Sequence, residues 1–281
     1  MSDIFNNREL AILIWLTLIL ILLSFKKGIL KSYFDLLLAF FQDKIISSVL
    51  ISIIYVELII LLLAIVNYWE MDLLKDTTFW YIGTAFLLML NSNKALENKT
   101  HFKKIFWNSF KLIVVLEFIT NFYTFDLLWE LVLIPIVSFI AILDAFAEQK
   151  NEHKPVKKLT QAILTIIGII IFVYSAKKII TNSNEFLNVN SAQILLLPII
   201  LTLLFLPFLY FYVLYMKYEN IYCRIGFRFK NKDKDFLNIK KRIFQECKLN
   251  LRKLERLEKT NSFHHILDYS DLEKTIKELN R

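Results

Sequence analysis

The chain has 281 residues, of which 56% are hydrophobic, and its formal net charge is +8. Soluble domains are about 45–50% apolar, so this composition, with a mean hydropathy of +0.49, excludes an ordinary soluble enzyme. Aromatic residues make up 15% of the chain, which excludes a disordered protein. The two cysteines, Cys223 and Cys247, are too few for a disulfide framework or a cysteine-based zinc site.

The positive charge is concentrated after the last apolar run. Residues 217–281 contain seventeen Lys/Arg and ten Asp/Glu, a net charge of +7, whereas residues 1–216 carry +1. We therefore predict two domains. Residues 1–216 form a transmembrane helical domain, and residues 217–281 form a small, basic, cytosolic helical domain with a regulatory role. The expected fold class is all-α, a polytopic membrane helix bundle.

Apolar runs in chain order predict about seven spans, or five if two marginal runs do not cross. The runs are 10–25, 45–69, 78–90, 110–123, 127–145, 159–176 and 194–215. The third and fourth runs are short for a bilayer, so they are either tilted spans or a re-entrant pair. Between the first two runs, residues 29–41 carry apolar side chains at helical spacing, which predicts an amphipathic helix in the membrane interface.

The distribution of Lys and Arg among the short loops orients these spans. With the N-terminus outside and all seven runs crossing, the inside loops, counted with Lys111 at the inner end of the fourth run, contain thirteen lysines, and the outside segments contain four Lys/Arg. Removing the two marginal runs as a pair leaves this orientation unchanged. We expect a multi-pass protein of the bacterial inner (cytoplasmic) membrane, with the N-terminus outside and the C-terminus in the cytoplasm.

Ionisable residues at bilayer depth are costly and indicate functional positions. Glu57 lies in the middle of its run, and its own helix offers it no partner. Either a buried structural pair or a place in a pore or gate explains it. Asp126 and Glu130 are one turn apart near the outer surface, where we expect both to be solvated.

Two further runs carry polar stripes at helical spacing. The stripes are Glu117, Thr120, Asn121 and Thr124 in one run, and Gln161, Thr165, Gly168 and Ser175 in another. Such stripes either line a water-filled path or join helices in lipid. We favour the path for the first stripe and leave both readings open for the second. The predicted pore-lining residues are Glu57, Glu117, Thr120, Asn121, Gln161 and Thr165.

Catalytic chemistry has no support in the sequence. There is no H-E-x-x-H, G-x-S-x-G, P-loop or C-x-x-C motif, and all four histidines lie outside the predicted spans. The pair His264–His265 lacks further ligands for a metal ion. We therefore expect a protein that is not an enzyme, with no catalytic residue, no metal site and no cofactor.

The basic tail predicts two helices. Apolar residues recur every three or four positions from Phe236 to Leu257, which predicts a single amphipathic helix of about six turns. The sequence SDLE at 270–273 is a capping box, which predicts the start of a shorter helix with its apolar residues facing inward. The two helices pack as a hairpin, or as a bundle between subunits.

The other face of the tail is strongly basic, and aromatic residues alternate with cations just upstream of it. Its predicted ligand-binding residues are Arg224, Arg228, Lys240, Lys241, Arg242, Lys248, Arg252 and Arg256. Anionic lipid headgroups explain such a surface in the simplest way. The sharper hypothesis is a polyanion sensor, in which basic side chains bind phosphates and aromatic rings stack on bases.

The order of elements resembles a family of bacterial membrane effectors of antiphage defence. The stretch NNRELAILIWLTLILILLSFKKGILKSYFDLLLAFF, the further spans and the basic helical tail are similar to the channel subunit of Hailong-type systems. The resemblance implies an oligomeric, anion-selective channel that a nucleotide-derived DNA oligomer holds shut. It also implies a partner nucleotidyltransferase that makes the oligomer. The acidic in-span residues Glu57 and Glu117 do not fit anion selectivity if they line the pore.

The leading hypothesis is an oligomeric, ligand-gated ion channel that acts as an antiviral defence effector. Its expected partners are the bilayer, other copies of itself (a tetramer is one option), and an anionic nucleotide or short DNA oligomer. The alternative is a proton- or ion-coupled transporter that uses Glu57 and Glu117. Only four glycines, no G-x-x-x-G motif and no internal repeat are seen, which disfavours a rocking transporter. A third possibility is a non-conducting scaffold whose tail recruits a soluble protein.

Overall fold

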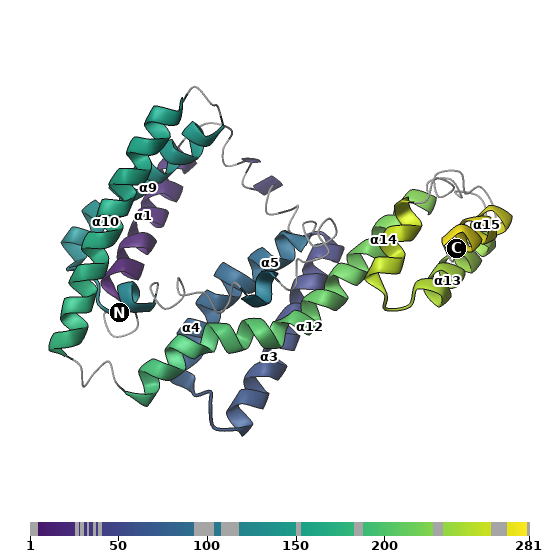
Figure 1. The fold of residues 1–281 in the computed structure, drawn as a ribbon, viewed down its shortest axis with the longest axis horizontal. Coiled ribbons are helices and arrows are strands. Elements are labelled where there is room, and N and C mark those ends of the chain that lie inside the picture. Colours follow the sequence, from purple (N-terminus) through teal and green to yellow (C-terminus); the bar gives the residue numbers. More distant parts are fainter. Residues whose placement is uncertain are drawn as a thin grey trace. The chain divides into compact units, whose positions relative to one another are not determined.

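The chain is described from a computed structural model (Figure 1). It describes residues 5–25, 28, 31–32, 34–35, 38, 41–92, 104–107, 118–149, 153–182, 188–226, 233–259 and 269–279. Over these residues every regular element is helical. The principal elements are α1 (Asn7–Ser24), α3 (Asp43–Ile65), η1 (Met71–Leu73), α4 (Leu74–Trp80), the π-helix η2 (Tyr81–Ala85), α5 (Phe86–Leu90), α9 (Leu127–Glu148), α10 (Lys154–Thr181), α12 (Val189–Gly226), α13 (Asp233–Cys247), α14 (Leu251–Lys259) and α15 (Tyr269–Leu279).

Five of the described helices are long and apolar enough to cross a membrane. They are Asn7–Ser24, Ile45–Ile65, Leu127–Glu148, Lys154–Thr181 and Asn190–Gly226. Each coincides with one of the strong apolar runs predicted from the sequence. The run 78–90 falls on three short helical pieces, α4, η2 and α5. The runs 29–41 and 110–123 lie largely outside the described residues.

The helices belong to two compact units, which we describe separately. Unit 1 comprises Met1–Ile51, Asn67–Asp76 and Phe110–Ile199, and unit 2 comprises Ser52–Val66, Thr77–Ser109 and Ile200–Arg281. Helix α12 is continuous through residues 216 and 217, so the predicted domain boundary falls within one helix.

In unit 1, α9 packs against both α1 and α10 (Figure 1). Near the start of both α1 and α9, the Asn7 side chain donates to the Phe125 carbonyl at 3.0 Å, so these two helices run parallel. Helices α9 and α10 run antiparallel, because the Thr160 hydroxyl donates to Asp144 at 2.7 Å near the end of one and the start of the other. Parallel α1 and α9 are compatible with seven crossings and also with five.

A proline within a candidate span leaves a backbone carbonyl that another helix satisfies. Pro135 has no N–H to bond the carbonyl of Leu131, four residues earlier, and the Trp15 indole of α1 donates to that carbonyl at 2.8 Å. Lipid offers no hydrogen bonds, so such a partner stabilises a helix that contains proline in a membrane. In unit 2, the Tyr55 hydroxyl of α3 donates to the Leu204 carbonyl of α12 at 3.0 Å and joins these two helices.

The interior of unit 2 around α12 is aromatic. The Trp80 indole donates to the Thr202 hydroxyl at 2.9 Å, and its ring meets the Phe205 ring edge-on with centroids 5.7 Å apart. Phe205 is fully buried. The polar edge of the indole therefore has a partner while its ring adds to the apolar core.

The first tail helix differs from the sequence prediction. Instead of one helix of six turns, the chain forms α13 and α14, separated by residues 248–250. Lys248 has a φ of +44°, a left-handed conformation that ends α13. The Asn250 side chain then accepts a hydrogen bond from the Lys253 amide at 3.1 Å and caps α14.

The apolar stripe of the tail is buried as predicted, and it packs partly on α12. We call this cluster the tail core. It consists of Val213, Leu214, Tyr218, Ile221, Ile225, Ile239, Ile243, Cys247, Leu251, Leu254, Leu257, Leu272 and Ile276. Helices α13, α14 and α15 contact one another, and the last turns of α12 belong to the same core. The tail is therefore joined to α12 by hydrophobic packing as well as by the chain.

Candidate functional site

The predicted pore residue Glu57 lies on the exposed face of α3. The buried face in unit 2 consists of Ser52, Val56, Ile59, Ile60 and Leu63. The exposed face is apolar apart from Glu57 and consists of Ile53, Ile54, Leu58, Leu61 and Leu62. At 1.5 Å per residue, Glu57 is about 21 Å from the start of α3 and about 12 Å from its end. A single carboxylate thus interrupts an apolar surface near mid-span.

The first predicted polar stripe is only partly described. Glu117 lies outside the described residues. Thr120 and Asn121 lie beside the start of α1: the Arg8 guanidinium donates to the Thr120 carbonyl at 3.1 Å and to the Asn121 side-chain oxygen at 3.0 Å. These contacts put Asn121 in a structural network with Arg8, a role of the kind that the sequence offers as the alternative to a water-filled path.

That network is built around Glu130, which we expected to be solvated. This expectation is wrong, because the Glu130 side chain is fully buried. Its two carboxylate oxygens accept bonds from Arg8 Nε at 3.1 Å and Nη2 at 3.0 Å, and the Phe125 amide donates to one of them at 3.1 Å. A buried carboxylate needs such a charged, bidentate partner. Arg8 supplies it from 122 positions away, and no local pattern could have signalled this.

A second ion pair extends the network at the start of α1. Lys75 Nζ lies 3.1 Å from a carboxylate oxygen of Glu9, which also takes part in the capping box at Asn6. Asp76 is next in the chain. Burial raises the pKa of the Asp76 carboxyl, Lys75 acts to lower it, and the negative charge of Glu9 acts to raise it. This end of unit 1 therefore contains three carboxylates and two cations in a partly buried environment.

The second predicted stripe is split between two environments. Gln161 and Thr165 are exposed on α10, and the Thr165 hydroxyl donates to the Gln161 carbonyl of its own helix at 2.7 Å. Ser175 is fully buried and donates to the Tyr123 carbonyl at 2.9 Å. Ser175 thus acts as an interhelical contact in unit 1, whereas the side chains of Gln161 and Thr165 are exposed.

In the tail, two of the predicted ligand-binding residues are engaged within the structure. Arg242 donates to Glu273 at 2.7 Å and lies 3.5 Å from Glu246. Lys240 places its ammonium group 4.4 Å from the ring centroid of Phe236 and 5.2 Å from that of Tyr222. Both cations are half-buried, so they stabilise the packing of the tail.

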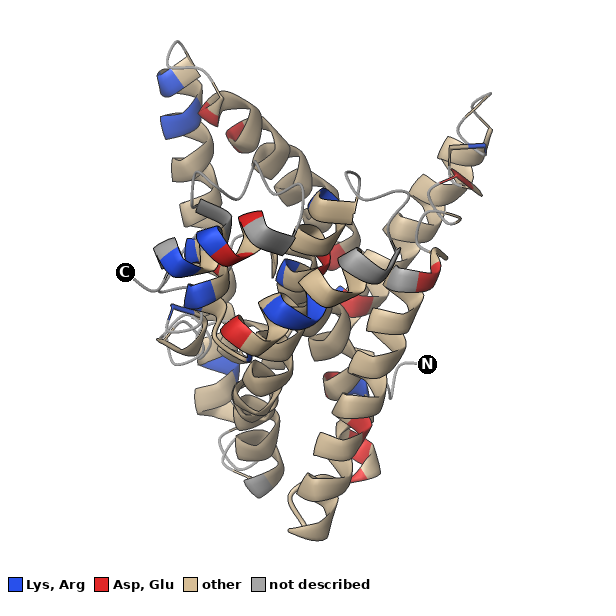
Figure 2. Cartoon of the chain, turned by 90° about the vertical axis from the view of Figure 1, so that its right-hand side faces the viewer, with Lys and Arg blue, Asp and Glu red and all other residues tan. Residues whose placement is uncertain are grey.

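The other described members of the set form the basic surface. They are Arg224, Lys241, Lys248, Arg252 and Arg256, all exposed; Arg228 lies outside the described residues. Among them, Lys241, Lys248 and Arg252 form no ion pair with a described residue. Figure 2 shows Lys and Arg recurring on the short helices near the C-terminus, whereas the long helices are mostly uncharged. We call Lys241, Lys248 and Arg252 the basic triad.

Three tyrosines of α12 bond the backbone beneath this surface. Tyr218 donates to the Lys248 carbonyl at 2.7 Å and Tyr210 to the Leu249 carbonyl at 2.7 Å. Tyr222 donates to the Lys240 carbonyl at 3.3 Å. The turn between α13 and α14, which carries one cation of the basic triad, is therefore bonded directly to the helix that leads into the last candidate span.

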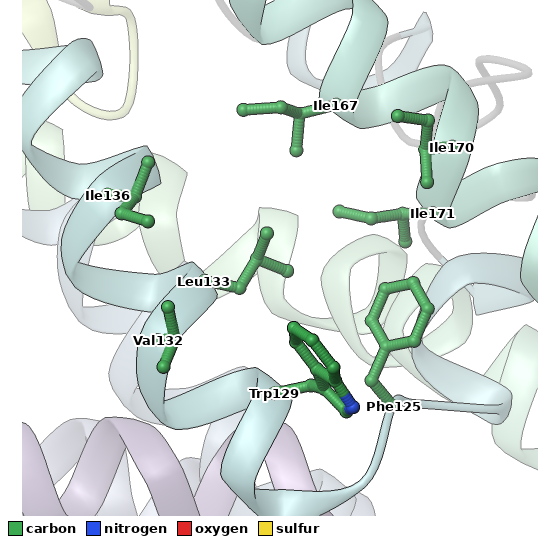
Figure 3. Close-up of a pocket in the computed structure, with 8 residues that line it drawn as sticks. All are labelled: Phe125, Trp129, Val132, Leu133, Ile136, Ile167, Ile170 and Ile171. Carbon is green, nitrogen blue, oxygen red and sulfur yellow. The ribbon is translucent and has the colours of Figure 1, made fainter.

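One apolar groove of about 470 Å³ lies in unit 1 between α9 and α10 (Figure 3). Its lining is hydrophobic throughout, with Phe125 and Trp129 at one end, and consists of these two residues with Val132, Leu133, Ile136, Ile167, Ile170 and Ile171. No ionisable side chain lines it, so the groove offers no group for acid–base or nucleophilic chemistry.

Within the described part of the chain, no three His, Cys, Asp or Glu side chains are grouped so as to hold a metal ion. Comparison of the chain with protein-family models, with curated proteins and with solved structures finds no match.

Proposed function

We propose that the chain is a subunit of an oligomeric ion channel in the bacterial inner membrane, gated by an anionic ligand that binds the basic surface of the tail. A nucleotide or short DNA oligomer, made by a partner nucleotidyltransferase, is the proposed ligand. The proposed role in antiviral defence rests on the resemblance of the chain to antiphage effectors.

The observation that carries the proposal is the exposed carboxylate of Glu57 on the apolar face of α3. A charge at the centre of a bilayer-spanning helix costs about 2.5–3.5 kcal/mol by insertion scales, so Glu57 does not face lipid without compensation. It makes no hydrogen bond or ion pair with a described residue. Water in a path bordered by α3 satisfies the carboxylate, and several subunits around an axis enclose such a path.

The continuity of α12 supports control from the tail. Nearly all of it, Asn190–Gly226, is one candidate span, and its last turns also belong to the tail core. Tyr210 and Tyr218 bond α12 to the turn that carries Lys248, one cation of the basic triad. A ligand that binds two arrangements of the tail with different affinity shifts the equilibrium between the corresponding arrangements of α12.

The proposed topology has the N-terminus outside and the tail in the cytoplasm, with seven crossings, or five if the runs 78–90 and 110–123 do not cross. With seven crossings, the excess of lysines in the predicted inside loops supports this orientation. The basic surface then faces the compartment that contains nucleotides.

Current through a planar bilayer containing the purified protein tests this function, with short DNA oligomers added on the tail side. We expect discrete openings, and we expect the oligomer to change their probability. In a triple variant, Lys241→Gln, Lys248→Gln and Arg252→Gln, the unit conductance should persist and the response to the oligomer should fall by about tenfold or more, because removing each cation that binds a phosphate weakens binding.

A matched variant removes three exposed lysines outside the tail that the proposed topology also places in the cytoplasm: Lys31→Gln, Lys154→Gln and Lys158→Gln. It should respond to the oligomer like the wild type. If the response to the oligomer decreased equally in both triple variants, the oligomer would be responding to the overall positive charge of the protein, and a specific site on the tail would be contradicted. Silent bilayers with correctly oriented wild-type protein would contradict the channel and favour a transporter that uses Glu57 and Glu117, or a scaffold.

A further inference from the structure

We infer that the ion pathway conducts cations in preference to anions and that Glu57 determines this preference. The inference rests on the proposed channel function and adds its selectivity. It is the opposite of the anion selectivity that the family resemblance implies.

The sign of the charge at mid-depth is the first argument. In α10 the cations lie at the two ends, within 154–158 and 177–178. In α12 they lie at Lys217 and Arg224, beyond the predicted crossing that ends at residue 215. Arg8 of α1 is bound to buried Glu130. Among the described candidate spans, Glu57 is therefore the one charged residue that lies near the middle of its predicted crossing, and its charge is negative.

The surroundings of Glu57 are the second argument. The residues one turn before and after it on the same exposed face, Ile53, Ile54 and Leu61, offer no opposite charge. No described residue neutralises the carboxylate through an ion pair. In a narrow path with apolar walls, an unneutralised acid attracts cations and repels anions strongly, because the low dielectric of the walls concentrates its field.

Repetition by symmetry is the third argument. Each additional copy of the chain around a common axis adds one Glu57 at the same depth. Rings of Asp or Glu are the usual selectivity device of cation channels, and flanking apolar rings can close a pore by excluding water. In a symmetric oligomer, the exposed isoleucines and leucines one turn from Glu57 would form apolar rings on both sides of the ring of carboxylates.

The test is the reversal potential in a KCl gradient across a planar bilayer, which gives the permeability ratio of K⁺ to Cl⁻. For the wild type we expect a ratio above about 10, the lower end of the counter-ion enrichment that a charged low-dielectric cleft produces. Glu57→Gln, which removes the charge and keeps the shape, should bring the ratio close to 1. Glu57→Asp, which keeps the charge, should retain cation preference.

Glu70→Gln is the matched control, because Glu70 is an exposed carboxylate in the segment after α3 and outside the candidate spans. It should leave the ratio unchanged. Currents that prefer Cl⁻, or a ratio that Glu57→Gln leaves intact, would overturn the selectivity inference while the channel function stands. Absence of current in the wild type would overturn the channel and the inference with it.

Discussion

The buried pair of Arg8 and Glu130 gives the sharpest prediction for the stability of unit 1. The change we propose is Arg8→Gln, which removes the guanidinium and leaves a side chain that cannot neutralise a carboxylate. Glu130 is fully buried, and Arg8 supplies two of the three hydrogen bonds that its carboxylate accepts from described residues. Among the described residues, the Phe125 amide is then the one donor that still bonds the carboxylate.

The expected cost is large because the remaining charge stays buried. Removing one member of a buried ion pair costs about 3–5 kcal/mol. Glu130→Gln should cost less, about 1.5–3 kcal/mol, since the Arg8 side chain is 17% exposed and keeps its bonds to the Thr120 carbonyl and the Asn121 side chain. The double variant should cost less than the sum of the two, with a coupling of about 2 kcal/mol.

The free energy of unfolding is measured in mixed detergent micelles by titration with a denaturing detergent, following tryptophan fluorescence. Trp15 is a suitable reporter, because its indole bonds α9 beside the pair. The control is Lys157→Gln, which breaks an exposed ion pair: the side chain of its partner Glu148 is 68% exposed. Such pairs contribute about 0–1 kcal/mol. If Arg8→Gln costs no more than Lys157→Gln, or if the double variant equals the sum, the argument from burial is refuted.

Three further predictions concern the tail and the end of unit 1. Tyr218→Phe removes the hydroxyl that bonds the Lys248 carbonyl, so it should cost about 1 kcal/mol and speed deuterium exchange of the α13 and α14 amides; unchanged exchange would contradict this attachment. Cys247 is buried, and burial raises the pKa of its thiol to about 11, whereas Cys223 is exposed. A maleimide at pH 7 should therefore label Cys223→Ser protein about tenfold or more slower than Cys247→Ser protein, and equal rates would refute the burial. Burial raises the pKa of Asp76, so the folded state binds its proton more tightly than the unfolded chain does. The melting temperature should therefore fall as the pH rises from 3.8, the ordinary value, through the raised pKa of the folded state. Asp76→Asn, which cannot ionise, should remove this fall. A wild-type melting temperature that stays constant, or that rises, over this pH range would contradict the raised pKa of Asp76.

Several elements of the fold could be predicted because their signals are local. A predominantly apolar run of about eighteen residues predicts a helix that can cross a bilayer. Four runs of this length or longer, and a first run of sixteen residues, coincide with the five long apolar helices. In the tail, the spacing of Ile239, Ile243 and Leu254 predicted their burial correctly. The inward positions of Leu272 and Ile276 followed from their spacing in the same way, whereas α15 begins at Tyr269, one residue before the start of the predicted capping box.

The break between α13 and α14 was missed for an identifiable reason. Cys247 and Leu251 are four residues apart, so the apolar stripe continues across the turn as though the helix did not end. The signal was present in Asn250, a preferred residue for starting a helix, directly before Leu251. Periodicity alone reports which face is apolar, and it does not report whether the backbone between two turns is helical.

The helical class, the apolar spans, the basic tail and the acid at position 57 follow from residues close together in the chain, so the order of residues is enough to predict them. The packing of the helices is needed to learn that Glu130 is buried against Arg8, that Arg242 is bound to Glu273, and that Glu57 is exposed. The same residue type, glutamate in an apolar run, thus has two opposite environments in one chain. The physical reason is that the environment of a charge depends on partners from distant segments, and these come together only when the helices pack.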